Sequence, residues 1–103
     1  MKVLITDGNE RAALAVTRAL GGEQVEVIVG AESQRSLAGS SRYCRRSITY
    51  PSPYQEPERF IATLMEAVRT HRVDALIPLS DIAMHVLGPE KAQFEKYTHF
   101  PAP

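Results

Sequence analysis

The sequence lacks several features that mark whole classes of protein. It has a single cysteine, no tryptophan, and no apolar run near the ~20 residues that a membrane span needs. One cysteine excludes an internal disulfide framework. The N-terminus meets an acid, Asp7, after three apolar residues, whereas a signal peptide needs a longer apolar stretch. These absences predict a cytoplasmic protein that is not bound to a membrane.

The chain also lacks a net charge, because 12 basic residues balance 12 acidic ones. This balance argues against a general nucleic-acid binder, which needs an excess of Lys and Arg to displace counterions. The charge is nevertheless uneven: residues 33–55 hold no acid but include Arg35, Arg42, Arg45 and Arg46. This basic segment is either a solvated edge or a patch that meets an anion or an acidic protein surface, including that of a second copy in a homodimer.

The length and composition fit one globular domain. The chain has 103 residues, of which 44% are apolar and 23% charged. We expect residues 1–100 to form the domain. The closing Pro-Ala-Pro, residues 101–103, is typical of the start of an interdomain linker.

Short apolar runs alternate with amphipathic stretches along the chain. Strands are expected at residues 2–6, 24–29, 45–50 and 73–79, with a short last strand at 98–100. Helices are expected at 10–20, from Pro57 onward, and at 82–87. This alternation predicts an α/β fold: a three-layer, Rossmann-like half with a parallel sheet of four to five strands in the order 3-2-1-4 and helices on both faces.

In such a sheet, ligands bind beyond the carboxyl ends of the strands, near the point where the strand order reverses. The residues expected there are Asp7, Gly8 and Asn9 after the first strand, and Ser80 and Asp81 after the fourth. They are our candidate substrate-binding residues. Ser80 or Asp81 is also expected to cap the helix that follows.

No complete catalytic or cofactor motif is present. A dinucleotide fingerprint needs G-x-G-x-x-G, and only Gly8 is found in the first turn. His71, His85 and His99 lack the i, i+4 spacing of a helical metal site, and no histidine or acid stands beside Cys44. We therefore predict no catalytic residue, no metal site and no cofactor within this chain.

Four segments resemble one known family. They are V-L-I-T-D-G-N-E-R-A-A-L-A at residues 3–15, S-L-A-G-S-S-R-Y at 36–43, Y-P-S-P with E-P-E-R-F at 50–60, and V-D-A-L-I-P-L-S-D at 73–81. In this order they are similar to the N-terminal, preATP-grasp domain of carbamoyl-phosphate-synthase-like ATP-grasp ligases. The resemblance covers essentially the whole chain.

The resemblance implies a place in a larger enzyme that uses ATP to join a carboxylate to an amine. It implies that downstream ATP-grasp domains of the same polypeptide hold ATP and magnesium, since nothing here matches their ATP-clamping lysines or magnesium-binding carboxylates. It also implies that the loops at residues 7–9 and 80–81 face a small carboxylate or amine substrate. The chain alone would not be a competent ligase.

Two other interpretations remain open from the sequence. One is a stand-alone Rossmann-like module that binds a nucleotide or small anion at residues 7–10, where a strand–turn–helix opening favours anions. The other is an interaction protein that uses the basic segment to pair with itself or with another chain.

Overall fold

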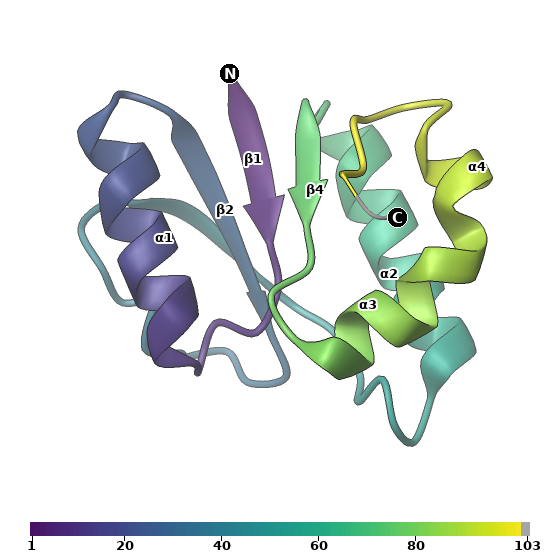
Figure 1. Cartoon of the computed structure of the whole chain (residues 1–103). Coiled ribbons are helices and arrows are strands. Elements are labelled where there is room, and N and C mark those ends of the chain that lie inside the picture. The colour runs from purple at the N-terminus through teal and green to yellow at the C-terminus, as the bar shows by residue number, and fades with distance from the viewer. Residues whose placement is uncertain (102–103) are drawn as a thin grey trace.

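Four parallel strands form one sheet at the centre of the molecule (Figure 1). The computed structural model describes residues 1–101. The strands are β1 (Lys2–Ile5), β2 (Glu26–Ala31), β3 (Cys44–Thr49) and β4 (Ala75–Ile77). The helices are α1 (Arg11–Gly22), α2 (Pro57–Thr70), α3 (Asp81–Leu87) and α4 (Lys91–Phe94), with a 3-10 turn at Gly88–Glu90. The strand order is β3-β2-β1-β4, which confirms the predicted α/β topology.

Helices lie on both sides of the sheet, as predicted. Figure 1 shows α1 on one side and α2, α3 and α4 on the other. Successive strand residues point to opposite faces, so each strand of this parallel sheet has two buried sides. In β1, Val3 and Ile5 pack toward α1, whereas Leu4 packs toward α2. We call these two sides the α1 face and the α2–α4 face.

The α2–α4 face is rich in aromatic side chains. All three phenylalanines of the chain, Phe60, Phe94 and Phe100, are fully buried there. The Tyr50 and Phe60 rings meet edge to face with their centroids 4.7 Å apart. The α1 face holds no aromatic residue in its core and uses valines, Ile5 and small residues such as Ala13.

The outer edge of β4 pairs with the end of the chain. Leu76 N–H donates to the His99 carbonyl at 2.9 Å, and His99 N–H donates to the Asp74 carbonyl at 2.9 Å. Ala75 and His99 form a parallel bridge, so the short last strand expected at residues 98–100 is present as a single bridge. Pro101 follows, and a proline has no N–H with which to extend the ladder.

The α1 helix ends later than its sequence suggests. The expected helix ended at residue 20, before Gly21 and Gly22, but the observed helix includes both glycines. Gly21 has a packing role instead, because a Cβ there would lie 2.6 Å from Tyr43 Cβ. The part of the predicted linker at residues 102–103 lies outside the described residues. Within residues 1–101, no helix is both long and apolar enough to cross a membrane.

Candidate functional site

The loops that follow β1 and β4 are joined at the carboxyl edge, the edge of the sheet where all four strands end. Thr6 is fully buried, and its hydroxyl accepts a hydrogen bond from Leu79 N–H at 3.0 Å. The same hydroxyl donates to the Asp7 carboxylate. Thr6 N–H also donates to the Ile77 carbonyl at 3.3 Å. The loop before Ser80 is therefore fixed to the residue before Asp7, as the strand order predicts.

Three backbone amides of the β1–α1 turn are already used within the protein. Asp7, at φ 62°, donates its N–H to the Tyr50 hydroxyl at 2.9 Å. Gly8 N–H donates to the Gly30 carbonyl at 3.0 Å, and Glu10 N–H donates to the Asp7 carbonyl at 2.9 Å. A phosphate-binding turn needs such amides free to point at the anion. This turn is therefore poorly suited to a pyrophosphate.

Gly8 is needed because a second loop lies directly against it. A Cβ at this position would sit 2.6 Å from Ser36 Oγ and 2.7 Å from Val29 Cγ1. Ala38 N–H donates to the Gly8 carbonyl at 2.8 Å, which holds the two loops together. Gly8 thus serves contact between protein segments rather than the close approach of a ligand.

A small cavity of about 100 Å³ lies at this edge, and its lining is acidic. The lining residues are Asp7, Gly8, Asn9, Glu10, Ala31, Glu32 and Tyr50. Three of them carry carboxylates, and none carries a positive charge. Coulombic repulsion therefore disfavours phosphate and carboxylate groups here, and the site favours an ammonium or another hydrogen-bond donor.

Tyr50 lines this cavity, although the sequence pattern did not point to it as a site residue. Its side chain is 4% exposed, and burial raises the pKa of the phenol well above its usual value, with a further contribution from the Asp7 and Glu32 carboxylates. Gly30 makes room for it, since a Cβ there would lie 2.8 Å from the Tyr50 ring. An aromatic residue directly after β3, together with a glycine in the neighbouring strand β2, was the available signal.

The predicted residues Ser80 and Asp81 begin α3. Ser80 is the N-cap, and its hydroxyl accepts from Ala83 N–H at 3.1 Å, as expected for a capping residue. Asp81 is exposed in the first turn. Asn9, at the other loop, is exposed and donates from Nδ2 to Ser33 Oγ at 3.3 Å. The cavity beside Asp7 does not include Ser80 or Asp81, so the five predicted residues form two neighbouring groups.

The structure brings together two of the four predicted arginines. Arg42 and Arg45 line a cavity of about 290 Å³ next to β2 and β3. Arg46 pairs in register with Ile28, so it lies on the α2–α4 face of the sheet. Arg35 belongs to the loop after β2, where its carbonyl accepts from Ser33 Oγ. The basic segment is therefore divided among three places.

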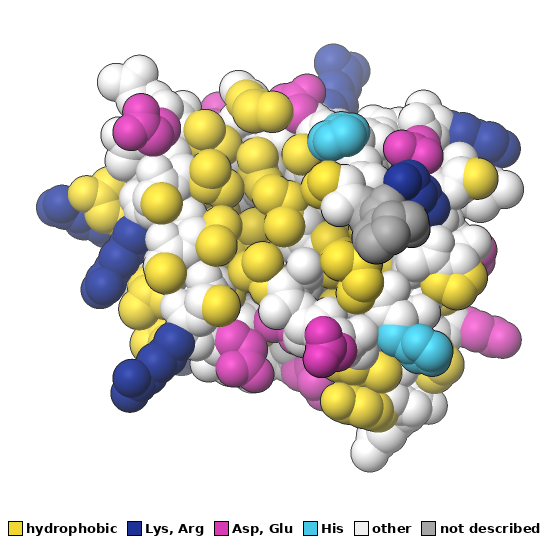
Figure 2. Space-filling view, in the orientation of Figure 1, with side chains coloured by type: hydrophobic (Ala, Val, Ile, Leu, Met, Phe, Trp, Pro, Cys, Tyr) yellow, Lys and Arg dark blue, Asp and Glu magenta, His cyan; other side chains and the backbone are white. Residues whose placement is uncertain are grey.

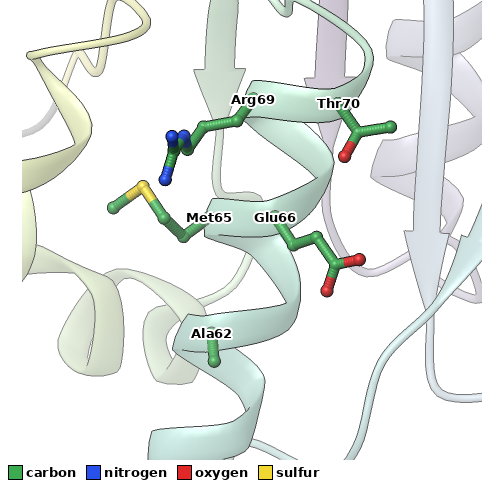
Figure 3. Close-up of a pocket in the computed structure, with 5 residues that line it drawn as sticks. All are labelled: Ala62, Met65, Glu66, Arg69 and Thr70. Atoms are coloured by element: carbon green, nitrogen blue, oxygen red, sulfur yellow. The ribbon is translucent and has the colours of Figure 1, made fainter.

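A larger cavity of about 560 Å³ lies along the outer surface of α2, away from the carboxyl-edge loops. It is lined by Ala62, Met65, Glu66, Arg69 and Thr70. In Figure 3, Met65 and Arg69 extend to one side of the helix while Glu66 and Thr70 extend to the other. The Arg69 guanidinium lies over the Tyr97 ring, 4.8 Å from its centroid. The polar side chains of this groove therefore do not converge on one point.

Histidine, cysteine, aspartate and glutamate side chains form no cluster of three or more that could hold a metal ion within residues 1–101. Asp7, Glu10 and Glu32 line one cavity without meeting that condition.

Comparison with known proteins supports the fold. No family model matches the chain, and no curated protein matches it. Among solved structures, the chain is similar to glycinamide-RNase-transformylase T from Mycobacterium tuberculosis, with a TM-score of 0.68 and 19% sequence identity. The match covers 97% of this chain and 28% of that one. At this identity the likeness shows a shared fold. The present chain spans only 28% of the length of that protein.

Proposed function

We propose that this chain is the N-terminal, substrate-side domain of an ATP-dependent carboxylate–amine ligase of the ATP-grasp superfamily. The observation that carries the proposal is the set of four family-like segments in order along a chain whose whole fold matches part of a longer enzyme. The domain boundaries that follow are residues 1–100 for the domain and 101–103 for the start of a linker.

The role of the domain would be to bind and orient one substrate at the carboxyl edge. Asp7, Gly8, Asn9, Ser80 and Asp81 remain the proposed substrate-facing residues, and the geometry adds Glu32 and Tyr50 to them. The carboxylates around Asp7 favour the amine substrate over the carboxylate one. The buried phenol stays protonated and holds the Asp7 amide, which fixes the loop that presents the Asp7 carboxylate.

ATP and magnesium would be held by downstream domains of the same polypeptide, where they would activate the carboxylate.

An apolar region of the surface supports a neighbouring domain of this kind. Figure 2 shows apolar side chains gathered between α1 and β4. The apolar residues of α1 that are exposed are Ala12, Ala15 and Ala19. Ile77 of β4 and Leu79 of the loop after it are half-buried. A large exposed apolar patch commonly marks a protein interface.

The stand-alone nucleotide- or anion-binding module is less well supported. Three amides of the β1–α1 turn are already hydrogen-bonded, and the adjacent cavity is acidic. Calorimetric titration with ATP, NAD and NADP tests this alternative directly. Saturable heat that Asp7→Lys strengthens would favour it over the ligase domain.

The decisive experiment uses the gene beyond the codon for Pro103. We expect the reading frame to continue into an ATP-binding region, and the full-length protein to release ADP only when a carboxylate and an amine are both supplied. Asp7→Asn and Glu32→Gln should raise the KM for the amine and leave the KM for ATP unchanged. A stop codon directly after Pro103, or ADP release that needs neither substrate, would contradict the proposal.

A further inference from the structure

A second groove runs between α1 and the loop that connects β2 to β3. Its volume is about 410 Å³, within the range of small-molecule sites. We call it the basic groove, and its lining residues are Leu14, Arg18, Leu37, Ser40, Ser41, Arg42 and Tyr43. Two of these side chains are cationic and none is acidic. It shares no lining residue with the acidic cavity at the carboxyl edge.

Arg42 is held in place before any ligand arrives. Its guanidinium lies over the Tyr43 ring, 4.9 Å from the centroid, and Nη2 donates to the Tyr43 hydroxyl at 2.8 Å. Tyr43 is itself packed against Gly21 of α1, where no side chain larger than hydrogen would fit. A guanidinium fixed in this way loses less conformational entropy on binding, and its remaining N–H groups stay available.

The loop that carries Arg42 is also fixed. Ala38 is fully buried, and its N–H donates to the Gly8 carbonyl. Cys44 N–H donates to the Ser41 carbonyl at 3.0 Å. Tyr43 N–H donates to Ser41 Oγ at 3.1 Å, so the Ser41 hydroxyl can still donate its own proton outward. The loop is therefore a preformed wall of the groove.

The positive charge of the groove is not neutralised within the protein. Neither Arg18 nor Arg42 forms an ion pair with a carboxylate in the part of the chain that the structure describes. Basic side chains project beside α1 in Figure 2. Arg42 also faces the neighbouring cavity, which holds Arg45 and one acid, Glu26. The charge balance on this side of α1 stays positive.

From these observations we propose that the basic groove binds an organic phosphate monoester. Two guanidinium groups and two serine hydroxyls supply donors for a dianion with three oxygens, whereas one arginine is enough to satisfy a carboxylate. Leu14 and Leu37 give the groove an apolar side, and Leu37 is 44% exposed. That side receives the organic group to which the phosphate is attached.

The test uses the full chain labelled with ¹⁵N and titrated with phenyl phosphate at constant ionic strength. We expect saturable shifts at the amides of Leu14, Arg18 and residues 37–43. Arg18→Gln and Arg42→Gln should each weaken binding about tenfold, since each removes a charge-assisted contact. Arg35→Gln and Arg46→Gln carry the same charge change outside the groove, and each should weaken binding less than about twofold.

Three further probes separate the parts of the proposal. Benzoate and inorganic phosphate should both bind more weakly than phenyl phosphate, and Leu37→Ser should reduce binding of phenyl phosphate but not of inorganic phosphate. Each variant is first checked for an unchanged amide spectrum away from the substitution. Shifts that do not saturate, or equal weakening by Arg35→Gln and Arg42→Gln, would overturn the site. Equal affinity for benzoate would overturn its assignment to phosphate.

Discussion

The two faces of the sheet are built differently. The α2–α4 face is closed by three helices and by all three phenylalanines of the chain, which are fully buried. The α1 face is covered by one helix and by smaller side chains, and Ile77 and Leu79 stay half-buried beside it. We therefore expect the first face to contribute more to the stability of the isolated chain. The second face keeps apolar side chains partly exposed to solvent.

Removal of a large side chain from the α2–α4 face should have the largest effect. Phe60→Ala deletes a ring that is 0% exposed and breaks the edge-to-face contact with Tyr50, so it should cost about 3–5 kcal/mol of unfolding free energy. A substitution on the other face, Val16→Ala, removes two half-buried methyl groups and should cost only about 1 kcal/mol. Urea denaturation measures both, and equal losses would contradict the difference between the faces.

Tyr50→Phe keeps the ring of the α2–α4 face and removes the hydroxyl that holds the β1–α1 turn. The Asp7 amide loses its acceptor, which should cost about 1–3 kcal/mol at neutral pH. The raised pKa of Tyr50 adds a pH dependence. The protonated phenol stabilises the fold below the unfolded pKa of about 10, and this stabilisation is lost as the pH rises through the folded pKa.

The wild-type chain should therefore lose stability above pH ~10 more steeply than Tyr50→Phe does. Urea midpoints measured for both proteins between neutral pH and pH 11 compare the two slopes. Parallel curves would show that the Tyr50 hydroxyl is not the group that titrates.

Ser80→Ala removes the N-cap of α3, the helix of the α2–α4 face that begins beside the candidate site. Loss of the cap at the start of α3 should cost about 1 kcal/mol. Ser80→Asn restores a capping oxygen and should recover most of the stability. In the full-length enzyme, a rise in KM for Ser80→Asn despite recovered stability would indicate contact between Ser80 and the substrate.

The smallest effect on stability is expected on the uncovered side. Ala15→Glu places a charge on the exposed surface of α1 and should change the unfolding free energy by less than about 0.5 kcal/mol. It should nevertheless weaken packing against a downstream domain, seen as faster proteolysis between the domains of the full-length protein. Ala62→Glu, on the exposed side of α2, is the matched control and should leave proteolysis unchanged.

Sequence patterns predicted the features that depend on neighbouring residues. Strand order followed from the alternation of elements, and the Ser80 cap followed from its place before a helix. Individual side-chain contacts between distant residues were not predicted. The hydrogen bond between Tyr50 and Asp7 joins residues 43 positions apart. The role of Gly21 depends on Tyr43, which no local pattern encodes.

The candidate site shows the same division. The loops at Asp7 and Ser80 were placed correctly at one edge, because parallel strands end together. The occupied amides of the turn, the acidic lining and the contribution of Arg18 to the basic groove depend on packing between segments. The sequence alone suggested one basic segment. In the structure, side chains alternate along β3, so Arg46 lies on a different face of the sheet from Arg45, which lines a cavity together with Arg42.

The space that Gly30 leaves for the Tyr50 ring makes these two positions a single unit for protein engineering and for sequence alignment. A methyl group at Gly30 would lie 2.8 Å from the ring, so the ring and its hydroxyl would have to move together. Relatives that carry a larger residue at position 30 should therefore carry a smaller one at position 50, with another acceptor for the amide at position 7. Redesign of the substrate loop should change both positions in one step, because either change alone leaves a clash or a void.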